Sequence, residues 1–444
     1  MNLKSDRRDF LMNLSVAAGA SASALSRTAL AGTAPLFFQT GPSQINVALI
    51  GCGGRGVHDI QLFRKNPGVR ITWVCDPDEE RRTKTAKALE IPEDHATGDL
   101  RQVLNDDTLT AVVVATPDHW HSIAAIMACN AGKHVYVEKP ISHNVREGRL
   151  LTEAAVRNKV QVQHGTQSRS TQMMIDAVRL LREGLIGDVL VAKCWNIQRR
   201  GSIGRGMDTS PPPGLDYDTW VGPATMIPYR TNRVHNRWTW WYHFGTGDMG
   251  NDGVHDIDYT RWGLGVDTHP SLIVAVGGKY VQDDDQEFPD TQQVTFEYPG
   301  DGGPGHRRML IYEQRLWSTN YPHNVDSGAE FYGRSGQMFL SRRGKIQVLD
   351  EKNRPVTIPV SPGPQNDAAH VQNFLAAIRG EGTLNADALT GHFSTSLCHL
   401  GNIAARVGRS LRFDPNTEQI VGDEEAGQLT RREYRDHWAR PADS

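Results

Sequence analysis

The 444-residue sequence has few cysteines, and they form no pattern. The five cysteines are odd in number and scattered singly, so they do not indicate a disulfide framework or a zinc cluster. The histidines match no compact metal-ligand spacing, and no metal is expected. The cysteines are Cys52, Cys75, Cys129, Cys194 and Cys398.

The sequence also has no large excess of positive or negative charge. Lys and Arg number 48 against 51 Asp and Glu, for a formal net charge of -3. This balance gives no general electrostatic reason to expect nucleic acid or an anionic membrane surface as a partner. No apolar run is convincing as a membrane span, and no internal repeat is visible. With 38% hydrophobic and 22% charged residues, the composition is that of a globular protein, and the length predicts two domains.

The sequence does contain a glycine-rich motif directly after an apolar run. Residues 45–50 read Ile-Asn-Val-Ala-Leu-Ile, which is typical of a buried parallel strand. In the dinucleotide fingerprint that follows, Gly51 permits a tight turn, Gly53 leaves room for a pyrophosphate, and Gly56 lets the next helix pack closely. The helix N-terminus then faces the phosphates with unpaired N–H groups. The predicted phosphate-binding residues are Gly51, Gly53, Gly54, Arg55 and Gly56.

A second apolar run, residues 69–75, ends on Asp76, twenty residues beyond Gly56. A carboxylate at this place accepts hydrogen bonds from the adenosine ribose hydroxyls. It would also repel a 2'-phosphate, so the motif predicts NAD rather than NADP. Arg55, Arg81 and Arg82 lie near in sequence and keep NADP open as the alternative.

The N-terminal 31 residues resemble a twin-arginine export signal. Arg7 and Arg8 precede a weakly hydrophobic, Ala-rich stretch and a small-residue cleavage site that ends at Ala31. The alternative is an ordinary disordered N-terminus. We therefore expect residues 1–31 to be a signal peptide, residues 32–43 to be a linker, and the protein to be periplasmic or otherwise exported.

The fold class predicted for the rest is α/β. Strand and helix patterns alternate over residues 44–166, which predicts a doubly wound parallel sheet of Rossmann type, with Asp99 and Asn144 as helix N-caps. Residues 167–444 show longer strand patterns separated by Pro- and Gly-rich loops, which predicts a C-terminal α+β domain with an open, largely antiparallel sheet. We expect this domain to bind substrate and to support homo-oligomerisation. The two helical patterns near the end are residues 368–379 and 388–407.

Further polar residues follow the predicted fourth, fifth and sixth strands. Ligands bind at the carboxyl ends of strands in open parallel sheets, so these residues are expected to line the cofactor site. They are Thr116, Pro117, Asp118, His121, Glu138, Lys139 and Gln167.

The fingerprint and the stretch Glu138-Lys139-Pro140 together resemble the glucose-fructose oxidoreductase, inositol dehydrogenase and rhizopine-catabolism (Gfo/Idh/MocA) family. The resemblance implies an NAD-dependent oxidoreductase that acts on CH–OH groups. It also implies that Lys139 lies beside the nicotinamide and the reacting hydroxyl, where a cation can stabilise the oxygen as charge develops.

In the same family, an Asp followed four residues later by a His faces the nicotinamide. His255 is retained here, but Asn251 stands at the Asp position, with Asp252 next to it. An amide cannot stabilise an imidazolium as a carboxylate does, so the charge could come from Asp252, Asp256 or Asp258. We expect His255 to be the general base, Lys139 its electrostatic partner, and Asn251 the group that orients a substrate hydroxyl.

Aromatic residues are frequent in the second domain, although aromatics form only 7% of the chain. Trp or Tyr beside polar side chains suits the apolar faces and hydroxyl edges of a sugar, polyol or glycoside. An aromatic core is the alternative for any single Trp. The residues expected to bind substrate are Trp195, Arg230, Trp241, Asp252 and His255.

Two alternatives to a sugar dehydrogenase remain. One is an NAD-dependent glycoside hydrolase of the same superfamily, which oxidises a ring hydroxyl, eliminates the aglycone and reduces the ring again. The sequence resembles that branch around Gly53–Gly56, Asp118–His121 and Gln167, but it lacks the branch's Tyr-Pro-Thr-His stretch. The other is a non-catalytic sugar sensor. If the protein is exported, NAD must be loaded beforehand and retained, and residues 201–206 or 32–43 are the segments expected to cover it.

Overall fold

The structure is a computed structural model, and it describes residues 44–235, 237–300, 303 and 305–435. The expected signal peptide and linker lie outside the described residues. Within the described part, no helix is long and apolar enough to cross a membrane. All five cysteines are buried and free.

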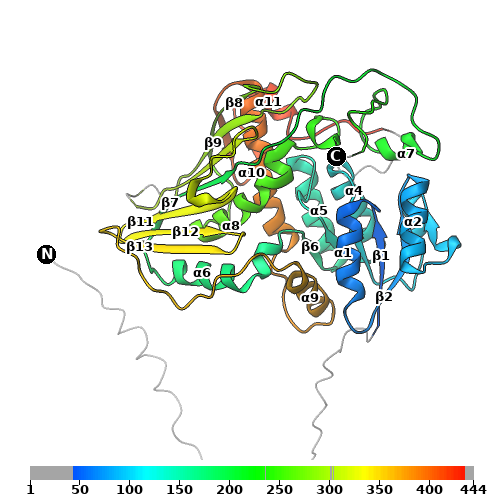
Figure 1. Ribbon diagram of the computed structural model, residues 1–444, viewed down its shortest axis with the longest axis horizontal. Coiled ribbons are helices and arrows are strands. Elements are labelled where there is room, and N and C mark those ends of the chain that lie inside the picture. Colours follow the sequence, from blue (N-terminus) through cyan, green and yellow to red (C-terminus); the bar gives the residue numbers. More distant parts are fainter. Residues whose placement is uncertain (1–43, 236, 301–302, 304, 436–444) are drawn as a thin grey trace, which may run out of the picture. The chain divides into compact units, whose positions relative to one another are not determined.

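The first sheet confirms the predicted Rossmann fold. Its six strands are all parallel in the order β3-β2-β1-β4-β5-β6, and helices lie on both faces (Figure 1). The strands are β1 (Ile45–Ile50), β2 (Val69–Cys75), β3 (Ala96–Thr97), β4 (Ala111–Val114), β5 (His134–Val137) and β6 (Val162–His164). The helices are α1 (Gly54–Arg64), α2 (Glu79–Leu89), α3 (Leu100–Leu104), α4 (Asp118–Asn130) and α5 (Val145–Asn158).

Alternation along β1 shows why this sheet is buried on both faces. Val47 and Leu49 point to the layer of α1, α2 and α9 (Asp367–Ile378), whereas Ala48 and Ile50 point to the layer of α3, α4 and α5. Helix α9 comes from the C-terminal part of the chain, so that part reaches back to the first sheet. The predicted N-caps are confirmed, because Asp99 accepts from the N–H of Arg101 and Asn144 from that of Glu147.

The second sheet is open and largely antiparallel, also as predicted. Its order is β13-β12-β11-β7-β10-β9-β8-β14-β15, and β7 and β10 form its parallel pair. The strands are β7 (Val189–Asn196), β8 (Leu272–Gly278), β9 (Thr291–Tyr298), β10 (Arg308–Arg315), β11 (Ser327–Gly333), β12 (Gly336–Ser341), β13 (Lys345–Asp350), β14 (Leu411–Asp414) and β15 (Gln419–Ile420). The pattern analysis missed β14 and β15.

One face of this sheet packs on helices through a single large apolar cluster. The helices that contribute are α6 (Gln172–Arg182), α8 (Val254–Leu264), α10 (Ala388–Val407) and α11 (Glu424–Gln428), together with Val145 at the start of α5. Helix α10 also packs against α5 of the first domain, so it joins the two parts of the chain (Figure 1).

Between β7 and α8 the chain forms a long segment, residues 197–253, with little regular structure apart from α7 (Tyr217–Val221) and short helical turns. The segment has an aromatic core of its own. It also contacts the first domain beside the end of β2, where the Glu79 N–H donates to the Gly214 carbonyl at 2.9 Å and the Asp216 N–H to the Pro77 carbonyl at 3.1 Å. This crossing brings second-domain residues to the carboxyl edge of the Rossmann sheet.

Candidate active site

The glycine turn after β1 has the shape that a dinucleotide phosphate needs. Gly51 has φ +99°, and a Cβ added to it would lie 2.5 Å from the Ala115 carbonyl oxygen. A Cβ on Gly56 would lie 2.0 Å from the Gly51 oxygen, so this glycine permits the close approach of α1. Gly54 has open space instead, and the N-cap of α1, Gly53, makes no side-chain capping bond. The first N–H groups of α1 are therefore open to an anion.

Asp76 lies buried at the end of β2, with its carboxylate turned back to the glycine turn. Its Oδ2 accepts from the Cys52 N–H at 2.7 Å and its Oδ1 from the Asp78 N–H at 2.9 Å. Burial raises the pKa of Asp76, while these backbone hydrogen bonds oppose the rise. Each oxygen keeps a further lone pair that can accept a ribose hydroxyl.

Arg55, a predicted cofactor residue, lines the cleft and also makes ion pairs within the first domain and with α9. Its guanidinium pairs with three carboxylates, Asp59 at 2.9 Å, Glu138 at 3.0 Å and Asp367 at 3.0 Å. Gln167 donates to the same Glu138 at 2.8 Å, and it does not line the cleft described next. Arg55 and Gln167 thus fix Glu138 next to Lys139.

These residues border a cleft of about 240 Å³ at the carboxyl edge of the first sheet. The predicted cofactor residues that line it are Gly51, Gly53, Gly54, Arg55, Asp76, Thr116, Pro117, Asp118, His121, Glu138 and Lys139. The cleft fits NAD, because it has a glycine turn at a helix N-terminus for the phosphates, the Asp76 carboxylate for a ribose, and Lys139 at the far end.

The second domain closes this cleft from the other side with residues that the sequence analysis missed. Thr219, Trp220, His235 and Trp238 line it, and His235 Nε2 lies 2.9 Å from Asp78 Oδ2. Residues 201–206, one of the two expected covers, do not line the cleft and contact residues 283–285 instead; for example, the Ile203 N–H donates to Asp284 Oδ2. The other expected cover, residues 32–43, lies outside the described part.

At the lysine end of the cleft, the two domains meet through Lys139 and Asn251. Residues Met249–Gly253 form a π-helical turn that runs directly into α8, and such turns are frequent at functional sites. Lys139 Nζ donates to the Asn251 carbonyl oxygen at 2.5 Å and to its Oδ1 at 3.2 Å. Asn251 Nδ2 in turn faces Asp248 Oδ1 at 3.4 Å. Asn251 therefore holds the lysine in place.

Asp252, next in the π turn, lies between two arginines. Its carboxylate pairs with Arg342 at 2.6 Å and with Arg200 at 3.0 Å, and it also accepts from the amide of Gln198. Arg342 follows β12, and Arg200 and Gln198 follow β7, so three strand or helix ends of the second domain meet here. Sequence patterns gave no signal for Arg342, which lies in an ordinary turn.

His255, in the first turn of α8, is buried, and its Nδ1 has no hydrogen-bond partner among the described residues. Burial and the nearby cations Arg342 and Lys139 hold the pKa of His255 well below its usual range, and Asp252 opposes that shift. The imidazole is therefore neutral near pH 7 and able to accept a proton.

The three carboxylates that follow Asn251 differ in their contacts and in their effect on His255. Asp258 is occupied by Arg169 at 2.7 Å and by the Ser394 hydroxyl at 2.6 Å. Asp256 accepts from the Tyr259 hydroxyl at 2.7 Å, and burial raises its pKa to about 7. The charge that opposes the shift of His255 is that of Asp252, whose own pKa is kept low by Arg342 despite its burial.

Three of the predicted substrate residues lie elsewhere. Trp195 is fully buried on the opposite face of β7 from Asn196, where it donates to the Val325 carbonyl, because side chains alternate along a strand. Trp241 belongs to the aromatic core of the long segment and is covered by a guanidinium 4.1 Å from its ring, that of Arg233. Arg230 pairs with Asp208 at 2.5 Å in the same segment. None of the three lines the cleft.

Comparison with known proteins now adds to this geometry. Residues 45–166 match the family described as "Oxidoreductase family, NAD-binding Rossmann fold", and residues 194–440 match "Oxidoreductase family, C-terminal alpha/beta domain". The chain belongs to the Gfo/Idh/MocA oxidoreductase family. The predicted family is thereby confirmed, and the first domain is an NAD-binding Rossmann domain.

Two of the similar proteins are a dehydrogenase and a glycosyl hydrolase family 109 protein. Scyllo-inositol 2-dehydrogenase (NAD(+)) of Bacillus subtilis (strain 168) is 30% identical over 313 residues, which are 70% of this chain and 78% of the relative. Glycosyl hydrolase family 109 protein 2 of Shewanella sp. (strain ANA-3) is 32% identical over 205 residues. That match spans 42% of this chain and less than half, 44%, of the Shewanella protein.

Solved structures share the fold of this family member. Aldose-aldose oxidoreductase from Caulobacter crescentus superimposes with a TM-score of 0.64 at 17% identity, over 83% of this chain and 100% of that one. Levoglucosan dehydrogenase, in complex with NADH and levoglucosan, gives 0.63 at 18% identity, over 83% and 99%.

Proposed function

We propose that the protein oxidises a hydroxyl group of a sugar, polyol or glycoside by hydride transfer to a tightly held NAD. One observation carries the proposal: Lys139, at the end of the cofactor cleft, donates to Asn251 in the π turn, and this turn runs directly into the helix that carries the buried His255. A cation and a neutral base together are what removal of a hydroxyl proton requires.

NAD bound in this cleft supplies the acceptor for the hydride that leaves the carbon. The proton of the same hydroxyl moves to His255, whose burial keeps the imidazole unprotonated beforehand. Lys139 stabilises the oxygen as negative charge develops, and Asn251 positions the ammonium. Asp252 then stabilises the imidazolium, and this carboxylate replaces the one absent from position 251.

The cofactor preference that we propose is NAD over NADP. Asp76 places a carboxylate at the ribose position. Arg55, which could have received a 2'-phosphate, is committed to three carboxylates. Arg81 lines the cleft and is the group that a competing NADP would use.

Export by the twin-arginine route is part of the proposal, on the sequence of residues 1–31. An exported enzyme needs to keep its nucleotide, and the Trp220 and Trp238 side of the cleft supports retention, since both side chains close it from the second domain. A retained cofactor must be regenerated in place. We therefore propose a closed redox cycle, in which one sugar is oxidised and another, or the same one, is reduced.

A second candidate is the redox-neutral glycoside hydrolase. The observation that favours it is the 32% identity to a glycosyl hydrolase family 109 protein over 205 residues. Against it stands His255 in place of the Tyr-Pro-Thr-His stretch of that branch. In a hydrolase of this kind, Lys139 and His255 would act on a ring hydroxyl, and the aglycone would leave before the ring is reduced again.

One experiment separates these functions. Protein purified without added nucleotide is denatured, the released nucleotide is identified by mass, and the intact protein is then offered a panel of sugars and aryl glycosides. Reduced nicotinamide absorbance with free sugars supports the dehydrogenase, and aglycone release without net reduction supports the hydrolase. Absence of both, with NAD bound, would reject catalysis on sugars.

We also propose that the chain forms a homo-oligomer through the open face of the second sheet. Apolar side chains stay exposed there, with Val274 at 43% and Val276 at 68% of full exposure on β8. Light scattering of the purified protein tests this, and a monomeric mass at micromolar concentration would contradict it.

A further inference from the structure

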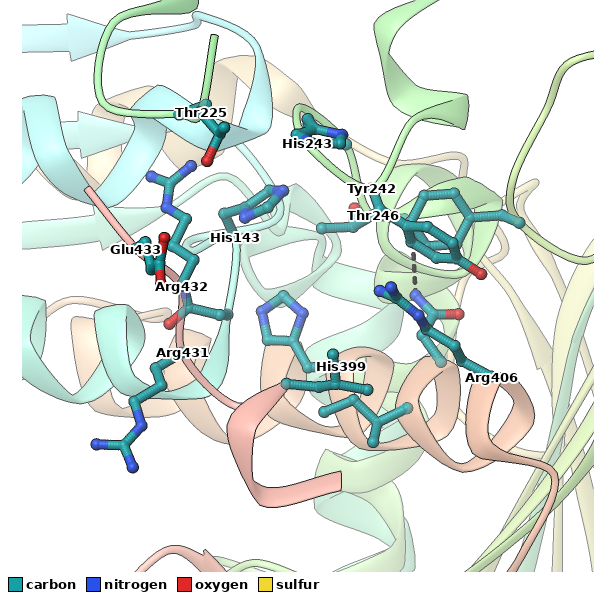
Figure 2. A pocket seen from close by; sticks show the side chains of 17 residues that line it. His143, Thr225, Tyr242, His243, Thr246, His399, Arg406, Arg431, Arg432 and Glu433 are labelled. Atoms are coloured by element: carbon teal, nitrogen blue, oxygen red, sulfur yellow. Dashed lines mark hydrogen bonds between the residues drawn. The ribbon is translucent and has the colours of Figure 1, made fainter. Parts of the chain in front are cut away.

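A second cavity lies apart from the cofactor cleft and has no role in the mechanism above. It encloses about 260 Å³ between the start of α5, the last turns of α10, the stretch from Tyr242 to Thr246 and the C-terminal residues 429–433 (Figure 2). The side chains that define it chemically are His143, Asn144, His243, His399, Arg406 and Arg432.

The wall of this cavity is rich in basic groups. It carries three histidines and three arginines, and its one carboxylate is that of the exposed Glu433. Arg406 lies over the Tyr242 ring at 4.0 Å and has no ion-pair partner in the described part of the chain. Burial and the Arg432 guanidinium lower the pKa of His143 well below its usual range.

Several donors in the wall have no partner among the described residues. Asn144 is 5% exposed and uses its Oδ1 to cap α5, but its Nδ2 makes no hydrogen bond. Both ring nitrogens of His143 are buried and unpaired as well. Arg432 is fixed by Glu147 at 2.7 Å and by the His119 carbonyl at 2.6 Å, which leaves its third nitrogen buried without a partner. Unpaired buried donors are costly, so their gathering at one cavity indicates a ligand that accepts hydrogen bonds.

The rest of the lining suits a molecule of sugar size. Phe288, Ile403 and Leu429 are apolar, and Tyr242 adds an aromatic ring that packs against Phe288 and under Arg406. Thr225 and Asn402 add neutral polar groups at the edge. A bare inorganic ion would leave most of this apolar surface uncovered, whereas a sugar ring that carries one anionic group would cover it.

The two cavities have no lining residue in common. The start of α4 and the chain around Phe244 and Thr246 separate them. Asp118 faces the cofactor cleft and accepts from the Thr246 hydroxyl at 2.6 Å, and Thr246 lines the second cavity. Arg432, on the second-cavity side, holds the His119 carbonyl at the same turn of α4.

We propose that this cavity is a second ligand site, which binds a sugar-sized molecule bearing one carboxylate or phosphate group. The anionic group is held by Arg432, His143 and the Asn144 amide, with Arg406 at the other end, and the ring lies against the apolar side chains of Phe288, Ile403 and Leu429. The site does not depend on the activity proposed above.

Isothermal titration of the full-length protein, as purified, tests the site with glucuronate, glucose 6-phosphate and neutral glucose. At least one of the two anions should bind roughly tenfold to hundredfold more tightly than glucose, as expected for a hydrogen-bonded charge. Asn144→Asp keeps the cap and replaces the free donor by a negative oxygen, and Arg406→Gln removes an exposed cation. Each substitution should weaken the binding of the anion about tenfold or more and leave the nucleotide content of the protein unchanged.

Arg412→Gln, which removes an exposed guanidinium on β14, is the matched control and should bind as the unaltered protein does. Loss of binding in Lys139→Gln with full binding in Asn144→Asp would place the anion in the cofactor cleft and overturn the proposal. Equal affinity for glucose and both anions would overturn it too. The anion that binds more tightly identifies the chemical class.

Discussion

Lys139 Nζ donates to the main-chain oxygen of Asn251 at 2.5 Å, so the lysine at the end of β5 is tied to the π turn that begins α8. The bond joins the NAD-binding domain to the helix that carries His255. Asn251 is a neutral partner for the lysine, and the carboxylate whose charge opposes the lowered pKa of His255 is that of Asp252, the next residue.

Replacement of Lys139 by Gln should lower kcat by about 10²- to 10³-fold, because one donor to a developing oxyanion is lost. NAD should stay bound, since the glycine turn and Asp76 are untouched. Steady-state kinetics and nucleotide content measure the two effects. Lys84→Gln, an exposed lysine on α2, is the control; an equal loss there would point to a general effect of charge.

The pH dependence of kcat/KM should report His255. The base acts in its neutral form, so activity falls as pH drops through its pKa, and burial with Arg342 and Lys139 places that pKa below the usual histidine range. We therefore expect the pH profile of kcat/KM to fall on its acid side only below that range. In His255→Gln this acid limb should disappear, and turnover should drop by about 10²- to 10⁴-fold. An acid limb that persists in the variant would mean that another group is the base.

Asp76→Asn should narrow the preference for NAD over NADP. The amide keeps the shape and one acceptor, but it removes the charge that repels a 2'-phosphate and two lone pairs available to the ribose. We expect a change of roughly tenfold to hundredfold in the ratio of the two dissociation constants. If the unaltered protein binds NADP as tightly as NAD, the assignment of Asp76 is wrong.

Asp256 gives a prediction about stability. Burial raises its pKa to about 7, above the value of 3.8 for an ordinary aspartate, so the folded protein binds a proton here that the unfolded chain releases. Stability from this group is full at low pH and declines as pH rises to about 7. Asp256→Asn keeps an acceptor for Tyr259, so it should raise the Tm at pH 8 and raise it less at pH 5, because the loss of stability begins near pH 3.8 and is complete near pH 7. A lower Tm at pH 8 would show that the ion pair of Asp256 with Arg342, at 3.6 Å, dominates.

The first domain could be predicted closely because its patterns are local. β1, β2 and β5 begin and end where the apolar runs do, and the glycine turn follows from spacing alone. The two-residue β3 was harder, since only position and neighbours define it. The second sheet was recognised by its strands, but its order depends on pairing between distant segments, such as β7 with β10, which no local pattern encodes.

Only part of the site could be predicted, because local motifs can be read from the sequence whereas contacts between distant segments cannot. Lys139, Asn251 and His255 belong to motifs, so the sequence could single them out; Lys139 and Asn251 line the cleft, and His255 follows four residues after Asn251 at the start of α8. Arg200 and Arg342 reach Asp252 from separate strand ends, so only the fold brings them there. Trp195 was assigned by composition, yet the alternation along β7 turns it away, a one-residue difference that composition cannot resolve.

The central claim is that a held NAD and the pair Lys139 and His255 oxidise a sugar hydroxyl. The most direct test is a single-turnover measurement on protein purified without added nucleotide. When the protein is mixed with the substrate found in the sugar panel, we expect reduced nicotinamide at close to one equivalent of the bound NAD. In His255→Gln, with the same NAD content, the reduced nicotinamide should appear much more slowly. An empty protein, or reduction at the same rate in the variant, would contradict it.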